Sequence, residues 1–171
     1  IYLEISDNNS FTNTSIRNIS SEVSIGIGLF NSTYNNFTDT SMKNINGDFI
    51  AIGVGLLNST HNTFDPTIIE NVNADGEICV ALGLTLSNSA NNNFTVTSIT
   101  NVSANLSVGI SLFNLMDILQ MLYEFMGEGD APQALGGNIQ SLDFGIPIPT
   151  NNNFLDTRIN NIRGNVFLLY K

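Results

Sequence analysis

"NNFTDTSMKNI" (residues 35–45) decides the fold of this chain, because the same pattern returns four more times. The other copies are "NNSFTNTSIRNI" (8–19), "HNTFDPTIIENV" (61–72), "NNNFTVTSITNV" (91–102) and "NNNFLDTRINNI" (151–162). Each copy has a Phe anchor, with an Asn two residues before it and a Thr three and an Asn seven residues after it. The anchors are 26, 27, 30 and 60 residues apart, a period typical of solenoids and other repeat arrays.

Apolar runs with near-alternating polarity lie between the copies, and we expect them to be strands. They are "VSIGIGLFN" (23–31), "AIGVGLLN" (51–58), "ICVALGLTLSN" (78–88), "LSVGISLFN" (106–114) and "NVFLLY" (165–170). A repeat of about 27 residues with short strands and no helix fits one coil of a parallel β-helix, whose coils bury their apolar edges jointly. The sequence therefore predicts an all-β fold, a single β-helix domain over residues 1–171 with about five coils.

The repeated positions predict columns of identical side chains that run from coil to coil. Phe, Ile and Val columns should stack inward at the strand spacing of roughly 4.8 Å, and Asn columns should form hydrogen-bonded ladders at the corners. We expect both the Asn column before the anchor (Asn9, Asn35, Asn62, Asn92, Asn152) and the one after it to form ladders, the second of them facing inward. The predicted structural ladder residues are Asn18, Asn44, Asn71, Asn101 and Asn161 together with Phe11, Phe37, Phe64, Phe94 and Phe154.

The spacing, the phrase "GIGLFNSTYNNF" (26–37) and the Asn-rich corners resemble the right-handed parallel β-helices of the pectate-lyase-like superfamily. More narrowly, they resemble adhesin-like surface proteins of archaea, which are built from Asn/Thr/Ile-rich repeats. The resemblance covers almost the whole chain except residues 115–147, and it implies a right-handed parallel β-helix. It implies no single function, because the same scaffold carries lyases, hydrolases, adhesins and purely structural proteins.

An insertion at residues 115–147 interrupts the repeat, because the last two anchors are more than one period apart. Its first part, "NLMDILQMLYEFMG" (114–127), has apolar residues at helical spacing, with Asn114 as an N-cap and Gly127 as a stop. We predict a helix over residues 115–126 followed by an irregular loop. The apolar face of the helix should cover the flank or end of the solenoid. A candidate partner surface consists of Met116, Met121, Tyr123 and Phe125.

The charge balance excludes one class of partner and favours one location. The net charge is −10 with only five Lys and Arg residues, which argues against nucleic-acid binding because that needs basic patches. Charged residues make up 12% of the chain, and Asn, Ser and Thr supply the polar surface instead. We therefore expect an extracellular or cell-surface protein that does not insert into a membrane.

Residue types that carry catalysis are scarce, so we predict no enzyme activity, no cofactor and no metal site. His61 is the single His and has no second His or Cys at metal-ligand spacing. Cys79 lies inside an apolar run and should be a small buried residue without a disulfide. Asp39, Asp65 and Asp156 fall near one corner with Arg158 as the nearest base, the residue types of calcium-assisted polysaccharide cleavage. Solvated corner acids are the favoured interpretation of these three residues.

Threonine pairs in the pattern T-x-T suggest a second alternative, since flat Thr arrays on some β-solenoids bind ice. The pairs are Thr12 with Thr14, Thr38 with Thr40, and Thr95 with Thr97. Asp65 and Leu155 break the first rank, and Pro66 interrupts the strand between them. Thr ladders that hold a corner are the favoured interpretation.

Nine N-x-[S/T] sequons occur, many of them by chance in a chain so rich in Asn, Ser and Thr. The best candidates for glycosylation, in a secreted protein, are Asn31, Asn58 and Asn105, which lie beside predicted turns. Asn18 and Asn101 belong to the ladder predicted to face inward, where a glycan does not fit.

The two ends of the chain suggest self-association. Residues 1–6 and 165–170 are apolar predicted strands with no cap, and an uncapped solenoid end exposes unpaired strand edges. We predict a non-catalytic structural or adhesive module of a cell surface or filament, either self-associating or part of a longer chain. A polysaccharide-binding or polysaccharide-cleaving β-helix and an ice-binding β-solenoid are the alternatives.

Overall fold

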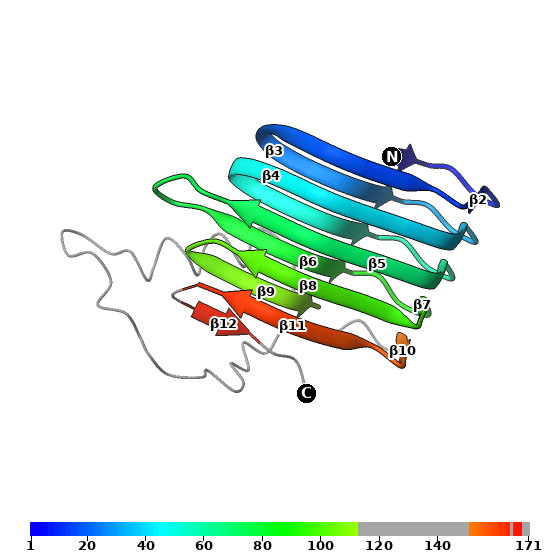
Figure 1. The fold of residues 1–171 in the computed structure, drawn as a ribbon. Coiled ribbons are helices and arrows are strands. Elements are labelled where there is room, and N and C mark those ends of the chain that lie inside the picture. The colour runs from blue at the N-terminus through cyan, green and yellow to red at the C-terminus, as the bar shows by residue number, and fades with distance from the viewer. Residues whose placement is uncertain (113–150, 165, 169–171) are drawn as a thin grey trace.

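The computed structural model describes residues 1–112, 151–164 and 166–168, and these residues form a parallel β-solenoid of about four turns (Figure 1). Every strand pairs in parallel with the equivalent strand of the next coil. The strands are β1 (Tyr2–Glu4), β2 (Ser10–Thr12), β3 (Ser15–Phe30), β4 (Asn36–Leu57), β5 (Thr63–Ala74), β6 (Val80–Ser87), β7 (Asn93–Thr95), β8 (Thr97–Ser103), β9 (Leu106–Ser111), β10 (Asn153–Leu155), β11 (Arg158–Arg163) and β12 (Val166–Leu168).

The Phe anchors set the register and correct the predicted number of coils. Each anchor pairs with the anchor of the next coil, from Phe11 through Phe37, Phe64 and Phe94 to Phe154. We number the coils first to fifth by these anchors. Five anchors bound only four complete turns, so the prediction of about five coils was slightly too high. The all-β parallel solenoid itself is confirmed, whereas the predicted helix at 115–126 lies outside the described residues.

The stacked Phe rings form the centre of the core. Neighbouring ring centroids are 4.8, 4.7, 4.9 and 5.2 Å apart along the column, and the ring planes differ by 4° to 9°. Phe37, Phe64 and Phe94 are fully buried, as are the apolar residues five and eight positions after each of them. The predicted inward Phe stack is therefore confirmed, and the core runs along the solenoid axis.

A glycine column lets the opposite wall approach this core. Gly26, Gly53 and Gly83 occupy equivalent positions in successive coils. A Cβ atom on Gly53 would lie 2.4 Å from Cγ2 of Ile69 and 2.5 Å from the carbonyl oxygen of Gly83. Because contacts that short do not occur, any side chain here would push the two walls apart.

The corners explain why Asn recurs in the sequence. Four positions of the repeat adopt a left-handed backbone, which Asn and Asp tolerate far better than other non-glycine residues. At the position seven residues after the anchor, all five coils use Asn, with φ between 53° and 59°. At the other left-handed positions, single coils use Ile5, Tyr34, His61 or Val96 instead. In the described ranges, no helix is long and apolar enough to span a membrane.

Candidate functional site

The Asn column before the anchor forms a buried ladder along one corner. Asn62 is fully buried, and its Oδ1 accepts bonds from the backbone N–H of Asn35 (2.9 Å) and from Asn35 Nδ2 (3.1 Å). Its Nδ2 donates to the carbonyl oxygen of Ser32 at 3.0 Å. Asn35 and Asn92 repeat the arrangement, each one coil apart. The ladder thus satisfies backbone groups that the tight corner leaves without a strand partner.

A serine ladder runs beside it, which the sequence reading did not identify. Ser32 Oγ donates to the carbonyl oxygen of Phe30 (2.9 Å) and accepts from the backbone N–H of Ser6 (3.1 Å). Ser59 and Ser89 repeat the first bond, and the N–H groups of Ser32 and Ser59 continue the second. The signal was present, because a Ser stands five residues before each of the first four anchors.

The Asn column after the anchor also forms a ladder, but it faces outward. Asn44 Nδ2 donates to Asn18 Oδ1 (2.8 Å), Asn71 to Asn44 (2.8 Å), Asn101 to Asn71 (2.9 Å) and Asn161 to Asn101 (3.1 Å). These side chains are half-buried or exposed. The predicted inward orientation was therefore wrong, because the left-handed backbone at this position turns the amide out of the wall.

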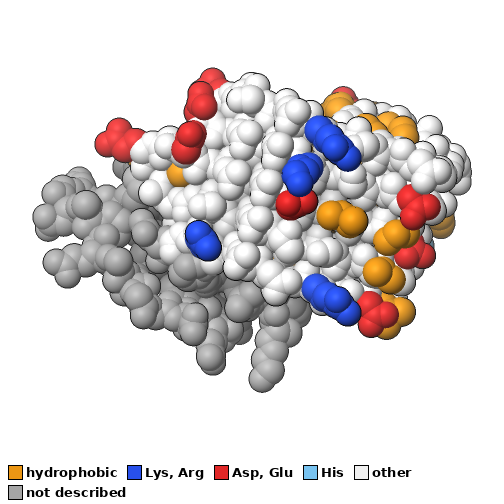
Figure 2. Space-filling view, in the orientation of Figure 1, with side chains coloured by type: hydrophobic (Ala, Val, Ile, Leu, Met, Phe, Trp, Pro, Cys, Tyr) orange, Lys and Arg blue, Asp and Glu red, His pale blue; other side chains and the backbone are white. Residues whose placement is uncertain are grey.

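This outer ladder lies on a polar wall formed by β3, β4, β5, β8 and β11. All the described basic residues, Arg17, Lys43, Arg158 and Arg163, occupy outward columns of this wall. Figure 2 shows the basic side chains spread across this face. Within the described part of the chain the one ion pair joins Lys43 to Glu70 at 3.1 Å, with both side chains partly exposed. This wall thus carries every described basic residue, although the protein as a whole is strongly acidic.

The T-x-T pairs do not form a flat outward array. Thr40, Thr67 and Thr97 point inward and are buried, because a left-handed residue or Pro66 precedes each of them at the corner. Their hydroxyl groups have no hydrogen-bond partner in the described part of the chain. A single outward rank (Thr12, Thr38, Thr95) is left, interrupted by Asp65 and Leu155, so the geometry expected of an ice-binding surface is missing.

The remaining candidate residues are dispersed. Asp39 of the second coil and Asp156 of the fifth occupy equivalent corner positions, and Asp65 lies one position earlier in the third coil. Among the described residues no three His, Cys, Asp or Glu side chains are placed to hold a metal ion. His61 is exposed and stacks on Tyr34 of the previous coil, with ring centroids 5.0 Å apart.

Cys79 is buried, as expected, and contacts the neighbouring coil. Its Sγ lies 2.9 Å from Asn105 Oδ1 and 3.2 Å from the carbonyl oxygen of Ala74. Burial raises the pKa of the thiol, and the backbone hydrogen bond from Asn105 opposes that shift only in part. The protonated form of the thiol is therefore favoured.

The candidate glycosylation sites differ in exposure. Asn31 and Asn58 are exposed at a corner, whereas Asn105 is half-buried and its Oδ1 accepts the backbone N–H of Cys79 at 3.1 Å. Of these three candidates, Asn31 and Asn58 thus have side chains placed to accept a glycan without breaking a bond to Cys79. The candidate partner surface at Met116, Met121, Tyr123 and Phe125 lies outside the described residues.

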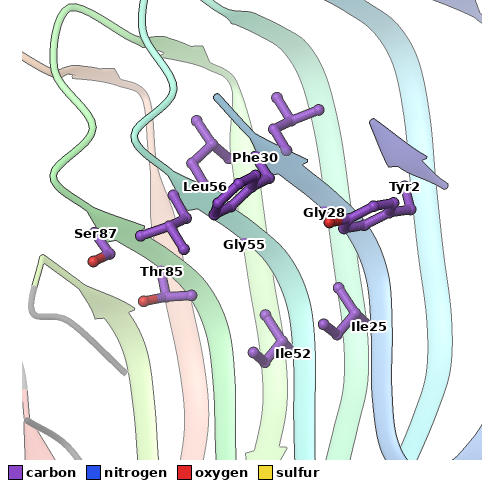
Figure 3. A pocket seen from close by; sticks show the side chains of 11 residues that line it. Tyr2, Ile25, Gly28, Phe30, Ile52, Gly55, Leu56, Thr85 and Ser87 are labelled. Carbon is purple, nitrogen blue, oxygen red and sulfur yellow. The ribbon is translucent and has the colours of Figure 1, made fainter. Parts of the chain in front are cut away.

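An apolar groove lies on the wall away from the outer Asn ladder (Figure 3). It has a volume of about 280 Å³ and is lined mainly by apolar side chains, including Tyr2, Ile25, Phe30, Ile52 and Leu57. The column that contains Gly28 and Gly55 faces this groove and keeps it open, because a Cβ on Gly28 would lie 3.3 Å from the Tyr2 ring. The sequence analysis did not predict the groove, since it placed the Phe, Ile and Val columns inward and named no apolar column on the outer surface.

Comparison with known proteins identified no relative of this chain. No protein-family model, curated protein or solved structure matches this chain. The arguments for function therefore rest on the residues themselves.

Proposed function

We propose that this chain is a non-catalytic structural module whose two end coils are extended by further coils, supplied by neighbouring copies or by more of the same polypeptide. The observation that carries the proposal is the match between the two ends. The first and fifth coils carry the same repeat, so the fifth coil of one copy can pair with the first coil of the next in the same register that the coils use internally.

The backbone hydrogen bonds of the inner coils define how such a junction would form. Ser41 N–H donates to Thr14 O of the coil before it (2.9 Å), and Asn13 N–H donates to Thr38 O of the coil after it (3.0 Å). By the same pattern, Ser15 N–H and Thr12 O of the first coil point along the axis, away from the second coil. Their complements on the fifth coil are Thr157 O and Asp156 N–H. A head-to-tail contact would therefore pair donors with acceptors.

Apolar columns at the two ends add a driving force. Phe11, Ile16 and Ile19 of the first coil are only half-buried, although their equivalents in the inner coils are fully buried. The fifth coil repeats this with Phe154, Ile159 and Ile162. Stacking one end on the other would cover both sets, and burying apolar area contributes about 25 cal/mol per Å².

A location outside the cell or on its surface agrees with the composition. The surface relies on Asn, Ser and Thr rather than charge, and Asn31 and Asn58 offer exposed sequons at one corner. Hydrogen-bonded corner amides and stacked Phe rings suit a rigid scaffold. A rigid scaffold at the cell surface would be consistent with an adhesin-like role.

Carbohydrate binding is the second candidate, and the polar wall favours it. The wall presents a row of amides at the coil spacing, with Arg and Lys side chains between hydroxyl groups. Such a surface offers many donors and acceptors to an extended polar polymer. Retention of the protein on immobilised polysaccharides, abolished by Asn71→Ala together with Arg158→Ala, would favour this function over a purely structural one.

The test of the structural proposal is an edge-blocking substitution. Ser15→Pro removes an N–H that makes no bond inside the solenoid, so it should leave the fold stable and stop end-to-end addition. Ser41→Pro is the matched control, because it removes the bond to Thr14 O and should destabilise the protein instead. Electron microscopy and sedimentation velocity should show extended assemblies for the wild type and none for Ser15→Pro. Assemblies unchanged by Ser15→Pro would refute the proposed junction.

A further inference from the structure

The internal repeat reveals where the surface departs from its own pattern. Three outward columns lie around the corner that follows the anchor, at one, two and four residues after each Phe. The first holds mainly Thr, the second mainly Asn or Asp, and the third mainly Ser. The departures are Asp65, Pro66 and Ile68 in the third coil, Val96 in the fourth, and Leu155 and Arg158 in the fifth. They are neighbours, because the strand register on either side of the corner gives Pro66 and Val96 equivalent positions in adjacent coils. The same register places Ile68, Ser98 and Arg158 in one column. We call these six residues the corner patch.

The corner patch exposes apolar side chains that the first two coils lack at these positions. Ile68, Val96 and Leu155 are 49%, 51% and 53% exposed. Val96 N–H donates to Leu155 O at 2.9 Å, which fixes these two residues side by side. Figure 2 shows hydrophobic side chains gathered toward the end of the face where β7 and β10 lie. A cluster of this kind at the surface marks a site of contact with another molecule.

Val96 also carries backbone strain. Its φ is 49°, a left-handed conformation that a β-branched residue rarely adopts, and Asn13, Asp39 and Asp156 hold this position in other coils. Such a conformation costs roughly 1 to 3 kcal/mol and persists only where the surrounding structure enforces it. An exposed apolar Val in place of Asn or Asp thus lowers the stability of the isolated chain, which agrees with selection for a contact.

The charges in the corner patch identify the partner. Asp65 and Leu155 lie two coils apart in the first of the three columns, and Ile68 and Arg158 lie two coils apart in the third. Val96 lies in the middle column of the coil between, so the four residues surround it. Two sides of this quadrilateral run along the solenoid axis and are roughly 10 Å long, from two coil spacings. The other two sides cross the corner, each between residues three apart in the chain. Neither Asp65 nor Arg158 is in an ion pair within the described part of the chain. The acid and the base occupy one diagonal, and Ile68 and Leu155 occupy the other.

We propose that the corner patch binds a second copy of this chain through a two-fold contact. A two-fold axis along the line from Leu155 to Ile68 generates the second copy. It places Leu155 and Ile68 of one copy against the same residues of the other. The same rotation puts Asp65 of each copy opposite Arg158 of the other, giving two ion pairs around an apolar centre at Val96. A patch that is complementary to itself in both charge and polarity fits an isologous dimer. This lateral contact is independent of the head-to-tail junction.

Sedimentation equilibrium in the Ser15→Pro background isolates the lateral contact, because end-to-end addition is blocked there. The patch is small, so the dimer should be weak and appear between roughly 10 μM and 1 mM. Asp65→Arg and Arg158→Asp should each weaken it by roughly tenfold or more, since each places like charges together. The double variant should restore the dimer, because it exchanges the two charges. A single monomeric species throughout this range would overturn the proposal, and so would a double variant no better than the singles.

Val96→Asn provides a second test that survives if a charge variant fails to fold. It restores a residue suited to the left-handed corner, so it should raise the melting temperature and at the same time weaken the dimer. Tyr34→Asn is the matched control, because Tyr34 is 58% exposed, has φ 56° and lies at another corner. It should leave dimerisation unchanged. Equal dimerisation in Val96→Asn and the wild type would show that Val96 is not in the contact.

Discussion

Replacing Asn62 by Ala tests the buried Asn ladder most sharply. The substitution removes the acceptor of the Asn35 N–H and the donor to the Ser32 carbonyl, and both groups lie inside the corner. An orphaned buried polar group costs about 1 to 3 kcal/mol, so the two together should cost about 2 to 6 kcal/mol. Asn35 Nδ2 keeps its bond to Ser6 O at 2.9 Å and adds little to the loss.

The outer ladder supplies the matched control. Asn71 makes comparable amide bonds at 2.8 and 2.9 Å, but its side chain is half-buried and water can replace those bonds. Asn71→Ala should therefore cost about 1 kcal/mol, mostly because Ala is strained at φ 59°. Asn71→Gly should be nearly neutral, because glycine adopts this conformation freely.

Thermal and urea unfolding followed by circular dichroism measure these differences. For a chain of this size each kcal/mol shifts the melting temperature by about 2 to 4 °C, so Asn62→Ala should lower it by about 4 to 24 °C. Solenoids can unfold in parts, so amide hydrogen exchange at the second and third coils should report the same loss locally. Equal losses for Asn62→Ala and Asn71→Ala would refute the distinction between a buried and an outer ladder.

Three further substitutions test the core. Phe64→Ala removes the middle ring of the stack and should cost about 3 to 5 kcal/mol in urea unfolding, and a loss below 1 kcal/mol would contradict the stacked core. Gly53→Ala should cost about 1 to 3 kcal/mol, because its Cβ would collide with Ile69 and with the backbone of Gly83; an unchanged melting temperature would mean that the walls are not in close contact. Thr67→Val should instead raise stability by about 1 kcal/mol, since the buried Thr67 hydroxyl lacks a partner, and a loss would indicate a bound water or an unrecognised acceptor.

Periodicity predicted the fold because each coil repeats the same physical requirements. The Phe column follows from the spacing of anchors alone, and the stacked rings confirm it. The invariant Asn residues could be identified as ladders, but their orientation could not. Asn can occupy a buried corner because its amide hydrogen-bonds backbone groups there, as Asn62 does. It can also occupy a corner because it tolerates a left-handed backbone, as Asn71 does. Sequence spacing does not separate these two roles.

Surface features were harder to predict because they depend on which face each strand residue occupies. Ile25 and Ile52 belong to apolar runs and line a groove outside the core. Thr40 and Thr97 look like members of a polar array, yet the corner before each turns them inward. The sequence alone shows which repeat positions of the corner patch depart from the pattern. The strand register is needed to show that Ile68 and Leu155 lie on either side of Val96.

The length of the assemblies formed at increasing protein concentration tests the central claim most directly. If the end coils accept further coils, sedimentation velocity and electron microscopy of the wild type should show rods that lengthen with concentration along the solenoid axis. Ser15→Pro should abolish these rods while its melting temperature stays within about 2 °C of the wild type, since the Ser15 N–H makes no bond inside the solenoid and the one bond lost, from Arg17 Nε to Ser15 Oγ (2.8 Å), is exposed. Isolated particles of about four turns at every concentration, in the wild type as in Ser15→Pro, would contradict the claim that the ends extend one another.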